Sequence, residues 1–188
     1  YGEDTTPLKK IANDFIVNFG KCLLSGRGLY IYSETKGSGK TKLACIITNE
    51  ILKRRDISVR FISVTEYIEL VKRKDDDSRN EIDTILHAGL LVVDDIGVQT
   101  ENKDWITTAM YRLIDVRYTE HLPTIYTSNV EITSLKTDSR ILERIYEVST
   151  RLPMPEVNIR RKIADRHTEK FLSELLNDSA GENIWDNP

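Results

Sequence analysis

The chain has 188 residues, of which 39% are hydrophobic and 30% are charged, and its formal net charge is −3. This composition suffices for one domain with a buried core and excludes an intrinsically disordered chain. It does not support a dedicated duplex-DNA binder, because such proteins usually carry a basic excess that contacts phosphates, but it leaves DNA binding open. Any nucleic-acid contact is therefore expected to be a local patch or to form within an assembly.

The sequence predicts a soluble, cytoplasmic protein. It contains no run of eighteen apolar residues and no charged-then-apolar leader. Because the first residue is Tyr1 rather than Met, we expect further sequence upstream. Cys22 and Cys45 are expected to be buried free thiols of a reducing cytoplasm rather than a disulfide. The three histidines are too widely scattered to share a zinc ion.

Apolar periodicity predicts helices that alternate with strands along the chain. A first helix is expected to be capped by Thr6, to begin at Pro7 and to end before Gly20. Strands are expected at 29–32, 59–63, 89–94, 124–128 and 151–154. Further helices are expected at about 41–55, 65–74, 80–88, 105–120, 139–148 and 160–176. This alternation predicts an α/β fold with a parallel sheet covered on both faces.

The strongest local signal is a glycine-rich loop between an apolar strand and an apolar helix. Such a loop points backbone N–H groups at phosphate oxygens, and the helix start adds its positive dipole end. Lys40 is expected to reach the β- and γ-phosphates, and Thr41 to place its hydroxyl on Mg²⁺. An ordinary turn is the alternative, which the strand–helix context disfavours. The predicted ATP-binding residues are Gly37, Ser38, Gly39, Lys40 and Thr41.

This loop departs from the full phosphate-loop pattern at its first position. The pattern wants glycine five residues before Gly39, where this chain has Glu34. A carboxylate facing the triphosphate would repel it. We therefore expect Glu34 to point away from the nucleotide, either paired with Lys36 or turned out to solvent.

Polar residues follow two of the later strands. Asp94 and Asp95 close the apolar strand at 89–94, where Asp94 is expected to hold Mg²⁺ and Asp95 to polarise the attacking water. Asn129 follows the strand at 124–128 and is expected to contact the γ-phosphate or to orient that water. The alternatives are acids that solvate a strand end and an asparagine that forms a turn.

These motifs together resemble the DnaC/DnaI type of AAA+ ATPase, the bacterial and phage replicative helicase loaders. Insertion-sequence helper ATPases are related to them. The similarity extends from Gly28 to about Phe171. Its most specific stretches are 90–101, 127–129, 139–145 and 158–161.

The resemblance implies an AAA+ P-loop NTPase core, a five-stranded parallel sheet with helices on both faces. The ATPase domain would span 1–176, with an N-terminal helix and turn at 1–27 and the core at 28–176, and 177–188 would be a flexible tail. By position, Walker A is matched by Gly39, Lys40 and Thr41, Walker B by Asp94 and Asp95, and sensor 1 by Asn129.

The resemblance also assigns roles to arginines near the end of the chain. Arg144, with Arg140 as second choice, lies in the segment that carries the arginine finger. Arg160, or else Arg161, matches sensor 2. Both sets also fit a solvated helix face. Because a finger acts across a subunit boundary, the family role requires self-association or docking on a related ATPase.

The leading functional hypothesis is an ATP·Mg²⁺-dependent helicase loader. It would help to place the replicative helicase on single-stranded DNA, with slow turnover in isolation, and no membrane contact is expected. Trp105 is the candidate for base stacking, with a core-capping role as the alternative. Asp95 departs from the glutamate that many AAA+ enzymes carry. The other hypotheses are a transposition helper, a low-turnover nucleotide-binding scaffold and a small-molecule phosphotransferase, the last disfavoured by the arginine segments.

Overall fold

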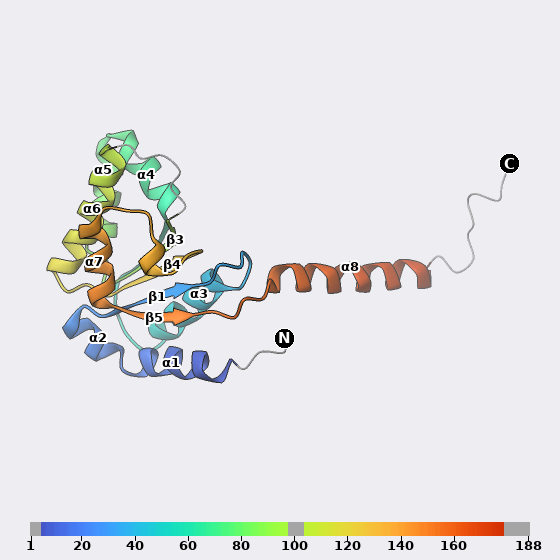
Figure 1. Ribbon diagram of the computed structural model, residues 1–188. Coiled ribbons are helices and arrows are strands. Elements are labelled where there is room, and N and C mark those ends of the chain that lie inside the picture. Colours follow the sequence, from blue (N-terminus) through green and yellow to red (C-terminus); the bar gives the residue numbers. More distant parts are fainter. Residues whose placement is uncertain (1–4, 98–103, 179–188) are drawn as a thin grey trace.

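A computed structural model describes residues 5–97 and 104–178 and contains one five-stranded sheet. All four strand pairs are parallel, and the strands lie in the order β2-β3-β4-β1-β5. Helices cover both faces (Figure 1). The predicted α/β fold, a five-stranded parallel sheet with helices on both faces, is confirmed.

The bounds of the elements follow the alternation that the sequence predicts. The strands are β1 (Gly28–Tyr32), β2 (Val59–Ser63), β3 (Leu90–Ile96), β4 (Thr124–Ser128) and β5 (Ser149–Pro153). The helices are α1 (Thr6–Val17), α2 (Phe19–Ser25), α3 (Lys40–Leu52), α4 (Val64–Arg73), α5 (Asp76–Leu86), α6 (Asp104–Thr119), the short 3-10 helix η1 (Ile132–Ser134), α7 (Ser139–Val148) and α8 (Ile159–Asp178).

Two apolar clusters lie on opposite faces of the sheet. Alternate residues of one strand point to opposite faces, so β3 contributes Leu90 and Val92 to one cluster and Leu91 and Val93 to the other. The helices α1, α2 and α3 cover the first cluster, and α4, α5, α6 and α7 cover the second. The central strands are thus buried on both faces of the sheet.

The bounds differ from the predicted ones at several places; α3 ends at Leu52 rather than at about 55, and β5 begins at Ser149 rather than at 151. Residues 6–20 form two helices that meet at Asn18 rather than one. The helix predicted at 80–88 begins at Asp76, because the Asp75 side chain accepts a hydrogen bond from the Ser78 N–H and caps it. β3 runs on to Ile96, two residues beyond the predicted end. The predicted tail at 177–188 lies outside the described residues from position 179 onward.

The last helix leaves the body of the domain. α8 begins beside the loop that follows β1 and extends away from the sheet (Figure 1). Its side chains from 159 to 175 are exposed or half-buried, and Phe171, Leu172 and Leu175 are each about half exposed. The first turn of α8 is therefore the part that bears on the candidate site.

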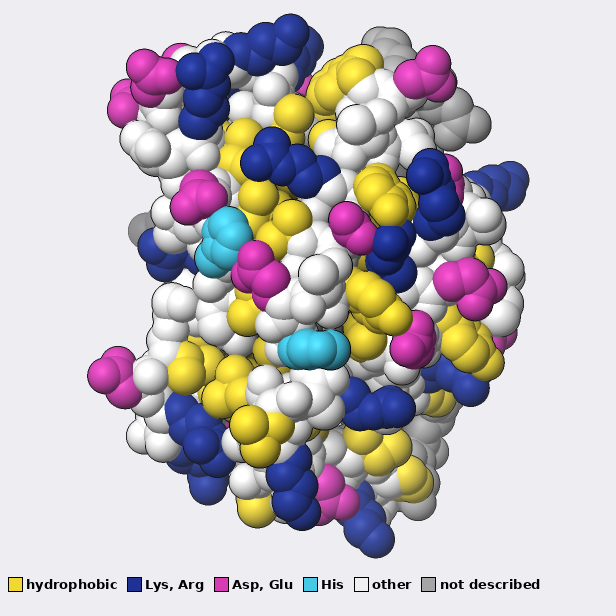
Figure 2. All heavy atoms as spheres, turned by 90° about the vertical axis from the view of Figure 1, so that its left-hand side faces the viewer, with side chains coloured by type: hydrophobic (Ala, Val, Ile, Leu, Met, Phe, Trp, Pro, Cys, Tyr) yellow, Lys and Arg dark blue, Asp and Glu magenta, His cyan; other side chains and the backbone are white. Residues whose placement is uncertain are grey.

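The surface formed over α6 and α7 carries mixed charge. Lys and Arg side chains lie among Asp and Glu side chains and hydrophobic ones on this face (Figure 2). A face of this kind does not present the single-signed field that attracts duplex DNA. Within the described ranges, no helix combines the length and the apolar character needed to cross a membrane.

The prediction of two buried free thiols is correct for the thiols but not for their burial. Cys22 and Cys45 are free thiols, as predicted, but both are half-buried rather than buried. Cys22 of α2 packs against the edge of an apolar cluster, and Cys45 lies on the flank of α3 next to buried Ala44.

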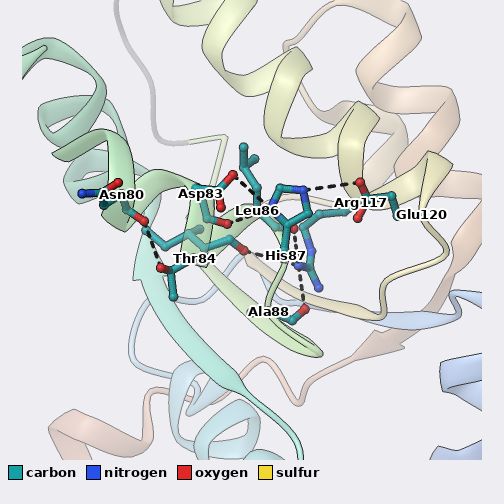
Figure 3. A network of polar contacts seen from close by, with 9 residues as sticks. Asn80, Asp83, Thr84, Leu86, His87, Ala88, Arg117 and Glu120 are labelled. Atoms are coloured by element: carbon teal, nitrogen blue, oxygen red, sulfur yellow. Dashed lines mark hydrogen bonds and ion pairs between the residues drawn. The ribbon is translucent and has the colours of Figure 1, made fainter. Parts of the chain in front are cut away.

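A buried arginine joins the end of α5 to the starts of β3 and β4. Arg117 of α6 is only 2% exposed. Its guanidinium donates to the carbonyl oxygens of Leu86 and Ala88 at 2.9 Å each (Figure 3). It also donates to the Pro123 carbonyl oxygen at 2.7 Å and to Thr124 Oγ1 at 2.7 Å. Burial lowers the pKa of Arg117 to about 10, so the side chain stays charged at neutral pH.

We expect Arg117→Met to lower the free energy of unfolding by about 3 kcal/mol or more, because buried carbonyl groups would lose a charged donor. Arg112→Met is the matched control, since Arg112 is exposed on the same helix; its effect should stay within about 0.5 kcal/mol. Urea unfolding of both variants measures the difference. Equal midpoints for the two would show that Arg117 does not hold these elements together.

Candidate nucleotide-binding site

The candidate site lies where the carboxyl ends of β1, β3 and β4 meet. In an open parallel sheet, ligands bind at this edge. β4 separates β1 from β3, so the loop after β1 and the acids at the end of β3 face each other across the end of β4. The residues that the sequence analysis assigned to nucleotide and metal ion are therefore gathered at one edge.

The loop after β1 has the backbone that phosphate binding requires. Gly37 and Gly39 both have positive φ angles, 76° and 96°, which favour glycine. Gly39 directly precedes α3 and contributes no capping side chain, so the N–H groups of the first helical turn remain available for an anion. Ser38 and Lys40 are buried within the loop.

Lys40 is held inside this loop by hydrogen bonds. The side chain is 6% exposed, and Nζ donates to the carbonyl oxygens of Ser33 at 3.1 Å and Thr35 at 3.3 Å. Burial lowers the pKa of Lys40, whereas the negative charges of Asp95, Glu156 and Asp94 oppose that shift. A buried ammonium group among carbonyl oxygens can exchange these partners for phosphate oxygens.

Asp94 joins the loop to β3 and β4. Thr41 Oγ1 donates to the Asp94 carboxylate, at 3.0 Å to Oδ1 and 3.2 Å to Oδ2. Thr127 Oγ1 donates to the same Oδ1 at 2.6 Å. Mg²⁺ prefers oxygen ligands, and in ATPase sites it takes one or two of them from the protein. The Thr41 hydroxyl and the Asp94 carboxylate therefore fit a Mg²⁺ ion that also contacts phosphate.

A β-bulge separates the roles of the two aspartates. Val93 pairs with Tyr126 and Ile96 with Ser128, so Asp94 and Asp95 together lie opposite one residue of β4. The Asp95 N–H donates to Thr127 Oγ1 at 2.9 Å. As a result Asp94 is buried against Thr41, whereas Asp95 is exposed. Bulges of this kind aim side chains next to active sites.

The surroundings of Asp95 suit a proton acceptor. Its φ angle is 59°, a conformation that is uncommon for residues other than glycine. Although Asp95 as a whole is exposed, neighbouring atoms partly desolvate its carboxyl group; this desolvation and the adjacent Asp94 raise the pKa of Asp95, and Lys40, Arg160 and Lys36 oppose that shift. A carboxylate with a raised pKa accepts a proton from water more readily.

The predicted sensor residues lie near this edge. Asn129 follows β4 directly and is half-buried. Arg160 is in the first turn of α8, and its N–H donates to the Gly37 carbonyl oxygen at 3.1 Å. The Arg161 N–H donates to Asn158 Oδ1 at 2.8 Å, which caps α8. The start of α8 is thus in direct contact with the phosphate loop.

The two finger candidates lie on α7 and contact α6. Arg144 makes an ion pair with Asp115 at 2.7 Å, and its side chain is 24% exposed. Arg140 pairs with Asp138 at 2.9 Å, and its side chain is 64% exposed. Both guanidinium groups lie 4.6 Å from the centre of the Tyr111 ring. Both candidates therefore have partners within the subunit.

Glu34 and Trp105 are both at the surface. The Glu34 side chain is exposed, and among the described residues no ion pair joins it to Lys36. Trp105, in the first turn of α6, is 40% exposed and so is not a buried cap of the core. The predicted family stretch at 90–101 lies outside the described residues from position 98 onward.

Two residues of the site were not singled out from the sequence. Thr127 bonds both to Asp94 and to the Asp95 N–H, and only the adjacency of β3 and β4 reveals this. Glu156, in the connection from β5 to α8, accepts hydrogen bonds from the Glu34 and Thr35 N–H groups. No sequence motif marks Glu156, because its partners are more than a hundred positions away.

Comparison with known families gives a match that covers more than half of the chain. Residues 30–144 match the family model described as IstB-like ATP binding protein. The match contains the phosphate loop, both aspartates and α7 up to Arg144.

Curated relatives agree with this match. The replicative helicase loader DnaC of Escherichia coli K12 is 32% identical over 122 residues, 62% of this chain and 49% of DnaC. The loader DnaI of Bacillus subtilis is 28% identical over 114 residues, 59% of this chain and 36% of DnaI. The chain thus spans about half or less of the length of these relatives.

A solved structure shares the fold. The crystal structure of the DnaC helicase loader superposes with a TM-score of 0.66 at 26% identity, covering 77% of this chain and 86% of that one. The AAA+ P-loop architecture that the sequence resemblance implied is thereby confirmed.

Proposed function

The chain belongs to the family of IstB-like ATP-binding proteins and is homologous to the DnaC/DnaI helicase loaders, and we propose that it acts as a helicase loader. In this role it binds ATP with Mg²⁺, hydrolyses ATP slowly, and changes its hold on the replicative helicase with the nucleotide state. The observation that carries the proposal is the contact between Thr41 and Asp94 beside the buried Lys40, in a chain whose relatives are loaders.

Each residue of the site has a role in this proposal. Lys40 contacts the β- and γ-phosphates, and the N–H groups of 37–41 surround the β-phosphate. Thr41 and Asp94 hold Mg²⁺, which when bound neutralises phosphate charge. Asp95 accepts a proton from the attacking water.

The sensor residues complete the nucleotide site. Asn129 orients the attacking water, and Arg160, or else Arg161, contacts the phosphates as sensor 2. Arg160 is the better placed of the two, because it is one of the charges that act on Asp95. A cation at this position neutralises charge that develops on the phosphates during transfer.

The test is a pull-down of the replicative helicase from the same host. We expect the helicase to be retained with this protein when ATP and Mg²⁺ are present, and retention to change when ADP replaces ATP. Absence of helicase binding in every nucleotide state, with nucleotide binding intact, would contradict the loader role.

A transposition helper is the second candidate, favoured by the family description itself, which is IstB-like. In that case the same pull-down, made with the transposase of the same host, would retain the transposase and not the helicase. The residues of the nucleotide site would have the same roles in a helicase loader and in a transposition helper.

Single-stranded DNA is a further proposed ligand, with Trp105 as the stacking residue. Its 40% exposure at the start of α6 leaves part of the ring accessible to a base. The mixed charge over α6 and α7 (Figure 2) fits a contact that depends on stacking more than on a broad basic surface.

A further inference from the structure

We propose that Glu156 is a positioning residue of the nucleotide site, whose carboxylate holds the first half of the phosphate loop in the conformation that accepts ATP. The inference rests on the proposed nucleotide site. It assigns a role to a residue that lies 122 positions downstream of its first partner, Glu34.

The contact is bidentate. Glu156 Oε1 accepts from the Glu34 N–H at 3.0 Å, and Oε2 accepts from the Thr35 N–H at 2.7 Å. Two consecutive N–H groups directed at one anion form an anion-binding nest. Glu156 as a whole is exposed, but neighbouring atoms partly desolvate its carboxyl group, which is the largest single influence and opposes ionisation. The hydrogen bonds from Thr35, Glu34 and Ser33 together outweigh this desolvation and lower the pKa of Glu156. The group therefore stays ionised at neutral pH.

This contact lies where the loop departs from its usual sequence. The loop begins with Glu34 in place of the first glycine, and the Glu34 side chain points to solvent while its N–H group is directed at Glu156. The first two N–H groups of the loop are thus fixed by an acid from another element.

The connection from β5 to α8 also contacts the loop on both sides of this pair. The Met154 N–H donates to the Tyr32 carbonyl oxygen at 2.8 Å, and the Arg160 N–H donates to the Gly37 carbonyl oxygen at 3.1 Å. A Cβ atom at Gly37 would lie 2.8 Å from Asn158 Oδ1. Glu156 is therefore the middle one of three contacts that join the connection from β5 to α8 to the end of β1 and to the first half of the loop.

The attachment extends to the lysine that would contact the phosphates. Lys40 Nζ donates to the carbonyl oxygen of Thr35, the same residue whose N–H group Glu156 holds. Glu156 is also one of the negative charges that favour the protonated form of Lys40. Fixing Thr35 therefore helps to fix Lys40.

The test is Glu156→Gln in the whole chain. Glutamine has one acceptor oxygen, and its NH₂ group would face the second N–H donor. We expect the Kd for ATP to rise about tenfold, equivalent to 1.4 kcal/mol. We also expect the amide hydrogens of Glu34 and Thr35 to exchange faster, a readout that a general loss of stability would not confine to these two residues.

Glu143→Gln is the matched control, because Glu143 is exposed on α7, away from the phosphate loop. It should leave ATP affinity and the exchange at Glu34 and Thr35 unchanged. Glu143→Gln should melt within about 2 °C of the parent protein, since it replaces an exposed side chain by one of equal size. Thermal melting of Glu156→Gln checks that this variant is folded when its affinity is measured.

Unchanged affinity and exchange in Glu156→Gln would overturn the inference. Tighter ATP binding would also overturn it, because the carboxylate would then act by repelling phosphate. Lys40→Ala, measured alongside, separates this inference from the proposed function. If Lys40→Ala loses ATP binding and Glu156→Gln does not, only the role of Glu156 fails; if Lys40→Ala binds ATP normally, the nucleotide site itself fails.

Discussion

Replacing Lys40 by alanine is expected to weaken ATP binding by about a hundredfold or more, equivalent to roughly 2.7 kcal/mol, and to abolish hydrolysis. The ammonium group is buried in the loop and bonded to two of its carbonyl oxygens. Bound phosphates would take over these hydrogen bonds, and a charged donor gives the stronger bond in a buried place. Alanine supplies neither the charge nor the donors.

Titration with a fluorescent ATP analogue and a phosphate-release assay measure the two effects. Lys42→Ala is the matched control, because Lys42 is in the same helical turn but is exposed to solvent. We expect it to bind ATP within about threefold of the parent protein, since an exposed charge is screened. If Lys40→Ala and the parent bound ATP equally well, the assignment of the loop to phosphate would be wrong.

Much of the fold is readable from local pattern. The bounds of β2, β4 and α7 agree with the predicted ones. Each has a clear local signal: alternation or a continuous apolar run for the strands, and apolar residues at helical spacing after a capping acid, Asp138, for α7. The extension of β3 lacks such a signal, because it depends on the pairing of Ile96 with Ser128 of β4.

Some residues of the candidate site could likewise be predicted from the sequence, and others could not. Spacing along the chain is sufficient to assign Lys40, Thr41 and Asp94, because the strand–loop–helix pattern places them relative to one another. Thr127 and Glu156 could not be assigned from spacing. The strand order brings these two residues next to their partners, because β4 lies between β1 and β3, and β5 lies beside β1. This order cannot be obtained from spacing along the chain.

The bulge at the end of β3 is a third feature that pattern does not predict. The sequence predicts that the strand ends at Asp94, and the aspartates were expected to act on different partners. The structure shows how the two side chains are separated: the one extra residue of the bulge turns Asp94 inward and leaves Asp95 at the surface. Such local departures from regular pairing concentrate at functional sites.

A second large effect is expected at the proposed arginine finger. ATP hydrolysis should be slow in dilute protein and should rise when subunits assemble, because a finger acts in the site of a neighbouring subunit. Fingers supplied by a partner accelerate GTPases by roughly 10³–10⁵. We expect Arg144→Ala to remove a stimulation of about 10³ and to leave the rate of dilute protein unchanged.

Arg144 and Arg140 have different surroundings, so the effects of replacing each by alanine can be compared. Arg144 is held by Asp115 and lies near the rings of Tyr111 and Tyr118, so its guanidinium is ordered within its own subunit. Arg140 is more exposed and is paired with Asp138 next to it in sequence. Arg140→Ala is therefore the matched variant on the same helix, for which we expect less than a tenfold change.

The measurement is the hydrolysis rate as a function of protein concentration for both variants, with thermal melting to check folding. Arg144→Ala also loses its partly exposed ion pair with Asp115, which by itself is worth about 1 kcal/mol at most. A loss confined to Arg140→Ala would transfer the finger to Arg140. A rate that does not depend on protein concentration, on a helicase partner or on either arginine would remove the finger from the mechanism, and ATP would then be hydrolysed by each subunit alone.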